Sequence, residues 1–72
     1  MNKFAENQME VTLNEIGNIN AQWKQAGIMA DAAQADKDEQ GFTFWQNACK
    51  ECERRADEAW AVYNALEAIL GE

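Results

Sequence analysis

Two cysteines, Cys49 and Cys52, form a C-x-x-C spacing and are the residues of this sequence with the widest choice of chemistry. The spacing can supply two of the four ligands of a structural zinc site, or it can close a local disulfide. A reactive thiol is favoured by exposure, cationic neighbours or a helix N-terminus, whereas these two cysteines fall on the apolar seam of a predicted helix. We therefore expect core packing, with a disulfide and metal ligation as the alternatives.

The side chains that most enzymes use are missing from the sequence, which has no histidine and no serine. Histidine is the commonest general base, and serine is the hydroxyl nucleophile of the acyl-transfer triads. The acids Glu51, Asp57 and Glu58 lie beside Arg54 and Arg55, as they do in ordinary surface ion pairs. We expect a protein that is not an enzyme and needs no cofactor.

Residues 36–42 carry a dense run of charge that resembles the first seven positions of an EF-hand calcium loop. The match places side chains of the ligand types at Asp36, Asp38 and Gln40, the glycine of the sharp bend at Gly41, and a carbonyl donor at Phe42. The pattern then departs from the family, because Thr43 replaces an aliphatic residue and Asn47 replaces the bidentate glutamate. The resemblance thus implies weak calcium binding at most, and a capped acidic turn is the simpler interpretation.

The composition limits the chain to a single domain over residues 1–72, with 47% hydrophobic residues to build a core. A formal net charge of -7 repels phosphate backbones and anionic lipid headgroups. The sequence also has no apolar stretch of the length that crosses a bilayer. We expect no direct binding to nucleic acid or membrane, a cytoplasmic location, and, if there is a partner, a protein with a basic surface.

The second half of the chain predicts one helix over about residues 44–70, with Thr43 as its N-cap and Gln46 completing a capping box. Apolar residues hold two heptad positions through four repeats. These positions are Cys49, Ala56, Tyr63 and Leu70, and Trp45, Cys52, Ala59 and Leu66. Ala48, Val62 and Ile69 widen the stripe on one side and Trp60 on the other, which favours a bundle over a two-stranded coiled coil.

The first half predicts a helix over about residues 4–35, with apolar residues spaced three or four apart. This stripe comprises Met9, Leu13, Ile16, Ile19, Trp23, Ala26, Ala30 and Ala33. Gly27 could break the helix into two, and a capping box at Thr12 could leave the first eleven residues as a separate arm. With a turn at 36–42, the fold class is all-α: an antiparallel helical hairpin or a small three-helix bundle, with dimerisation into a four-helix bundle as a further option.

These observations favour a non-catalytic, acidic protein-binding module that blocks a basic surface on a partner protein. Small phage-encoded inhibitors such as anti-CRISPR proteins are of this type, although no family motif is matched, and a phage origin would place the protein in the host cytoplasm. The expected contact residues are Asp31, Asp36, Asp38 and Glu39, with Trp60 as an apolar anchor. The alternatives are a self-associating structural protein, active as a homodimer, and a weak calcium-binding or thiol-metal module.

Overall fold

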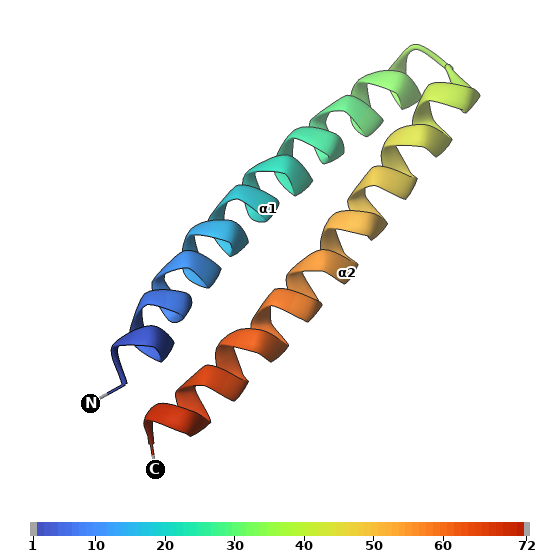
Figure 1. Ribbon diagram of the computed structural model, residues 1–72. Coiled ribbons are helices and arrows are strands. Elements are labelled where there is room, and N and C mark those ends of the chain that lie inside the picture. The colour runs from blue at the N-terminus through green and yellow to red at the C-terminus, as the bar shows by residue number, and fades with distance from the viewer. Residues whose placement is uncertain (1, 72) are drawn as a thin grey trace.

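The chain folds into two long helices that run antiparallel and are joined by a tight turn (Figure 1). The computed structural model describes residues 2–71, so the first and last residues of the predicted domain lie outside it. Helix α1 spans Lys3–Ala35 and helix α2 spans Glu39–Leu70. The hairpin measures 55 × 14 × 12 Å. The all-α prediction is confirmed, and between residues 2 and 71 the chain forms a two-helix hairpin rather than a three-helix bundle.

Helix α1 runs without interruption from its N-cap to the turn. The side chain of Asn2 accepts a hydrogen bond from the Ala5 N–H at 3.1 Å, which satisfies a free donor of the first turn. Thr12 does not cap a second helix start, because it is buried and its hydroxyl donates to the Gln8 carbonyl at 2.7 Å. Gly27 does not break the helix either, since α1 continues for eight residues beyond it.

The turn is shorter than predicted, and the predicted start of the second helix at Phe44 is wrong. Asp38, not Thr43, is the N-cap of α2, and its carboxylate accepts a hydrogen bond from the Gly41 N–H at 3.0 Å. Only residues 36–38 lie between the helices, and Lys37 takes the left-handed conformation with φ 57°. An earlier cap adds more than a turn of helical hydrogen bonds, and residues 39–43 contain no proline to prevent it.

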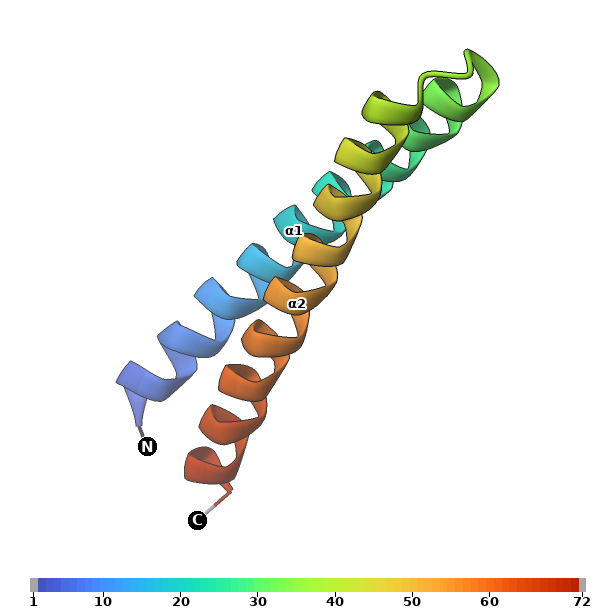
Figure 2. The same ribbon diagram turned by 90° about the vertical axis from the view of Figure 1, so that its right-hand side faces the viewer.

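One seam between the two helices forms the core, and small residues dominate it. On α1 the buried residues repeat every seven positions at Ala5, Thr12, Ile19, Ala26 and Ala33, with Ile16 and Ala30 beside them. Helix α2 contributes Cys52 and Ala59 to this seam. Figure 2 shows the helices crossing while they stay side by side along their length. Leu13 and Trp23, which the sequence placed in the stripe, are instead exposed, and the polar Thr12 takes a buried position.

A helix must contain a long apolar segment in order to cross a lipid bilayer. Neither α1 nor α2 contains a segment apolar enough to cross a membrane.

Candidate interaction surfaces

The two cysteines lie where the core-packing prediction put them. Cys52 is buried and packs with Ile16 and Ile19, and Cys49 is half-buried one turn earlier on α2. Both thiols are free, and the Cys49 thiol lies 3.9 Å from the Trp23 carbonyl oxygen, within reach of a weak S–H hydrogen bond. Residues 2–71 contain no group of three or more histidine, cysteine or acidic side chains placed to hold a metal ion. Packing of the seam therefore accounts for both sulfurs.

The acidic residues of the turn gather at one tip of the hairpin. Asp36 and Asp38 lie in the turn, Glu39 begins α2, and Asp31 lies on the last full turn before them in α1. All four are exposed, with Lys37 among them. The geometry is not that of an EF-hand loop, because the backbone from Glu39 onwards is helical and the Asp38 carboxylate caps that helix. The tip is thus a solvent-facing concentration of negative charge.

A second charged group lies halfway along α2. Arg54 donates from Nε to Glu51 at 3.1 Å, makes a further contact from Nη2 to the same carboxylate, and donates from Nη1 to Glu58 at 2.5 Å. The hydrogen bond from Arg54 is the main reason that the pKa of Glu51 lies below its ordinary value, and the same bond raises the pKa of Arg54. Because these side chains are more than half exposed, the ion pairs contribute little to stability.

Two tryptophans lie along one side of the hairpin, which we call the indole face and define by Leu13, Trp23 and Trp60. The Trp23 indole N–H donates to Glu53 at 3.3 Å, across the seam from α1 to α2. A shallow groove of about 230 Å³ opens beside it, lined by Asn20, Trp23, Cys52, Glu53 and Ala56. Leu13 and Trp60 lie on the same side, each seven residues from a lining residue of this groove. The indole face therefore combines exposed aromatic surface with a shallow concavity.

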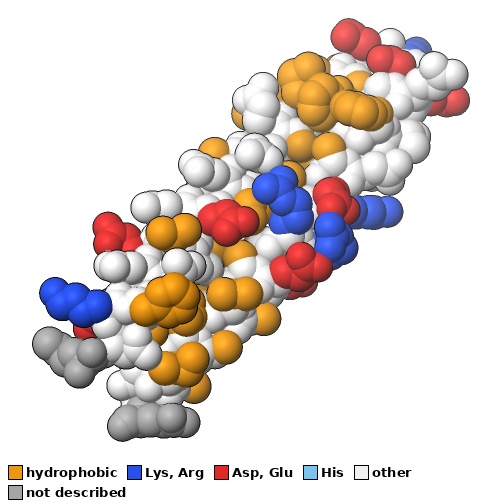
Figure 3. Space-filling model, viewed as in Figure 1, with side chains coloured by type: hydrophobic (Ala, Val, Ile, Leu, Met, Phe, Trp, Pro, Cys, Tyr) orange, Lys and Arg blue, Asp and Glu red, His pale blue; other side chains and the backbone are white. Residues whose placement is uncertain are grey.

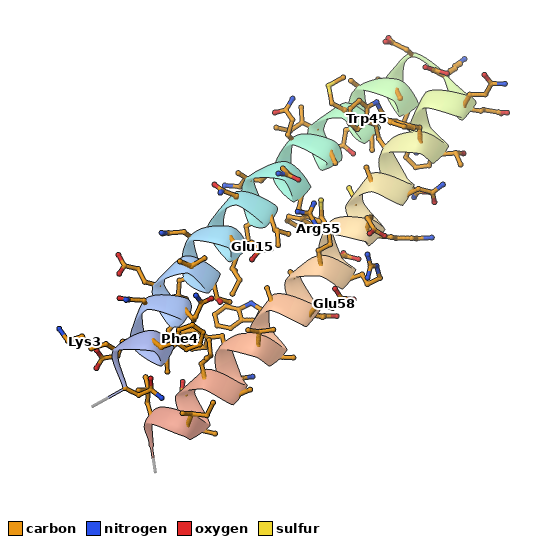
Figure 4. All side chains as sticks on the ribbon, in the orientation of Figure 1. Lys3, Phe4, Glu15, Trp45, Arg55 and Glu58 are labelled. Carbon is orange, nitrogen blue, oxygen red and sulfur yellow. The ribbon has the colours of Figure 1, made fainter. Side chains whose placement is uncertain are left out.

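The opposite side, which we call the front face, carries five exposed hydrophobic side chains: Phe4, Val11, Phe44, Val62 and Ile69. Figures 3 and 4 look onto it. A groove of about 240 Å³ lies between the helices on this side, lined by Thr12, Glu15, Arg55, Glu58, Ala59 and Val62. Arg55 also donates to Gln22 at 3.2 Å, which links the helices across the front. Phe44 stacks edge-on with Trp45, with ring centroids 4.9 Å apart.

The structure does not bring together all the contact residues predicted from the sequence. Asp31, Asp36, Asp38 and Glu39 share the tip, but Trp60 lies 21 residues along α2 from Glu39, or about 30 Å at 1.5 Å per residue. Trp60 instead packs edge-on against Tyr63, with ring centroids 5.5 Å apart. A partner that touched only the tip would not reach Trp60.

Sequence reasoning overlooked part of the front face. It placed Val62 and Ile69 at the edge of the seam, but it did not single out Phe4 and Val11 on the first helix. The available signal was their spacing: Phe4 and Val11 are seven residues apart, as are Val62 and Ile69. A repeat of seven outside the buried positions marks a second apolar stripe on the same side of the hairpin.

Comparison with protein-family models, with curated proteins and with solved structures finds no match to this chain.

Proposed function

We propose that this protein is a non-catalytic binding module that works by covering a surface on another protein. The observation that carries the proposal is the exposure of Trp23 and Trp60, which remain 45% and 43% exposed on the indole face of the complete hairpin. Tryptophan is among the residues that contribute most to protein interfaces, because a large rigid side chain loses little entropy when it is buried. Their placement beside the groove at Asn20 supports docking of a partner on this face.

The charge of the chain supports a partner with a basic surface. The net charge is -7, and part of it is concentrated at the tip, where the four exposed carboxylates of Asp31, Asp36, Asp38 and Glu39 face the single positive charge of Lys37. Such a charge steers a basic surface into contact and repels nucleic acid. Since the tip and Trp60 are about 30 Å apart along α2, a partner that uses both must lie lengthwise against the hairpin.

The proposal is tested by affinity capture from cells that express the protein, with three variants compared by mass spectrometry. The Trp23→Ala/Trp60→Ala variant removes both indoles, and Asp31→Asn/Asp36→Asn/Glu39→Asn removes tip charge while the capping Asp38 is kept. Ile28→Ala is the matched control, because Ile28 is exposed on the outer side of α1, between the buried Ala26 and Ala30.

The expected result is a basic protein that the wild type and the Ile28 control retain and the Trp variant loses. The tip variant should bind it more weakly, with a smaller dependence on salt. Circular dichroism should show the same helix content for all the variants. If no protein depends on the two indoles in this comparison, the proposed function is wrong.

A further inference from the structure

The front face presents an unpartnered apolar stripe on both helices. The exposed fraction of its five hydrophobic side chains ranges from 48% for Ile69 to 71% for Phe4. The residues that line the front groove show that these side chains share one side. Val62 itself lines the groove, and Val11 lies one helical turn before the lining residue Glu15. Phe44 lies two heptads before the lining residue Glu58 and so points to the same side. No residue between 2 and 71 covers this stripe, so these side chains face water in a lone hairpin.

The hydrophobic residues lie toward the two ends of the face, and the charged residues lie between them. Figure 3 shows the hydrophobic side chains gathered near the turn and near the opposite end of the hairpin, which we call the open end. Acidic and basic groups lie in the middle of the face. In Figure 4, Phe4 and Trp45 mark the two ends, and Glu15, Arg55 and Glu58 lie between them. Four of the five hydrophobic side chains lie toward the end opposite the turn, and Phe44 lies toward the turn beside Trp45. A copy turned end for end therefore places an apolar region of one hairpin against an apolar region of the other.

The chain exposes more surface than a compact monomer of its mass, and this excess is close to the area that each partner buries in a dimer. The chain exposes 5426 Å² at a mass of 8.1 kDa, whereas a compact monomer of that mass exposes about 4,500 Å². The excess is on the order of 900 Å², and a stable interface of standard size buries about 800 Å² on each partner. A second copy on the front face would bring the surface exposed per chain close to that of a compact monomer of this mass.

We propose that the front face binds a second copy of this chain, turned end for end, to form a four-helix bundle. In this arrangement Phe4, Val11 and Ile69 of one copy pack against the Phe44 end of the other. Arg55 lies at the middle of α2, so each Arg55 comes within about one helical turn of the other copy's Glu58. This homodimer is separate from the proposed partner contact, because it uses the opposite side of the hairpin.

The acidic tips disfavour the arrangement in which both turns point the same way. With the turns together, the acidic tips of the two copies would lie side by side and repel one another. Turned end for end, the two tips lie at opposite ends of the bundle.

The test of dimerisation is sedimentation equilibrium of the full chain over a range of concentrations, with Val62→Glu and the control Ile28→Glu. Both variants place a carboxylate at an exposed apolar position of a helix, so the hairpin fold is retained. The wild type and Ile28→Glu should be dimers. Val62→Glu should raise the dissociation constant on the order of tenfold or more, because the carboxylate would be buried without a partner. A monomeric wild type, or equal dimerisation of both variants, would overturn the proposal.

The end-for-end pairing is tested with a charge swap. Arg55→Glu places two carboxylates against each other across the interface and should weaken the dimer. Adding Glu58→Arg to the same chain restores opposite charges at both symmetry-related contacts and should recover most of the wild-type affinity. If the double variant dimerises no better than Arg55→Glu alone, the copies do not pair in this way.

Discussion

A single carboxylate determines where α2 begins. Asp38 and Thr43 are both acceptable N-caps by residue type, and the chain uses the first of them, with Glu39 in the first turn where the helix dipole favours negative charge. Gly41 permits this cap: a Cβ at that position would collide with the Asp38 carboxylate. Thr43 was the only cap predicted for this helix from the sequence, but the choice depends on which start lets the two helices remain paired up to the turn.

Removal of the Asp38 cap should destabilise the hairpin. Asp38→Ala leaves the Gly41 N–H without its acceptor and should lower the free energy of unfolding by about 1 kcal/mol. Asp36→Ala is the control, because Asp36 caps α1 through its backbone N–H. Urea unfolding followed by circular dichroism measures both variants. Equal losses for the two would show that the Asp38 side chain has no capping role.

The ion pair of Glu51 predicts a small dependence of stability on pH. The Arg54 hydrogen bond lowers the pKa of Glu51 in the folded chain below its ordinary value of 4.5, so the ionised carboxylate favours folding. This contribution is present above pH 4.5 and is lost as the pH falls through the lowered pKa. Glu51→Gln should therefore be slightly less stable than the wild type at pH 7 and equal to it at strongly acid pH. Urea midpoints across that range measure the difference, and a constant gap at all pH values would contradict the assignment.

At the scale of the element, α1 shows why a glycine in a helix pattern cannot be interpreted from local sequence. Gly27 lowers helix propensity by about 1 kcal/mol relative to alanine, which made a break at this position plausible. Pairing with α2 on both sides of Gly27 holds the helix together, because Ala26, Ala30 and Ala33 are all buried against it. Tertiary packing thus overrides a weak local preference.

Filling the glycine should stabilise the helix. Apart from the adjoining backbone of α1, no atom lies within 4 Å of where an alanine Cβ would stand at Gly27, so Gly27→Ala should raise the free energy of unfolding by about 0.5–1 kcal/mol. Thermal unfolding by circular dichroism measures this as an increase in Tm. A decrease would mean that the position needs a backbone freedom that a continuous α1 does not require.

The seam predicted for α1 was correct at most of its positions and wrong at Leu13 and Trp23, which are each 45% exposed. A spacing of three or four residues allows either Thr12 or Leu13 to face α2, and hydrophobicity alone chooses Leu13. The structure keeps a strict repeat of seven, which buries Thr12 between Ala5 and Ile19 and satisfies its hydroxyl on the Gln8 carbonyl. A buried polar side chain is tolerated when it is hydrogen-bonded in this way.

Truncation of Ile19 should therefore cost far more stability than truncation of Leu13. Ile19 is fully buried, and Ile19→Ala should cost about 2–5 kcal/mol through lost burial and the cavity left behind. Leu13→Ala, at a position 45% exposed, should cost far less. Denaturant unfolding of both variants gives the comparison, and similar costs would mean that the seam runs through Leu13 after all.

At the scale of the molecule, the heptad pattern and the charged turn were sufficient to predict an antiparallel hairpin, because two long apolar stripes with one short connection leave few other arrangements. The surfaces were harder to predict. Whether Trp60, Phe4 and Phe44 face the seam or the solvent depends on the rotation of each helix about its axis. That rotation is fixed by the packing of small residues such as Ala59, which periodicity alone does not resolve.

The elongation of the hairpin affects how it moves through a medium. A particle of 55 × 14 × 12 Å has more friction with water than a sphere of the same mass, so the chain should elute from a sizing column ahead of globular proteins of 8.1 kDa. A bundle of two copies laid side by side is wider than the single hairpin but no longer. On dimerisation its elution volume should therefore change by less than that of a spherical protein whose mass doubles. The elongated monomer and the more compact dimer should be distinguished by a measurement of mass rather than by elution position.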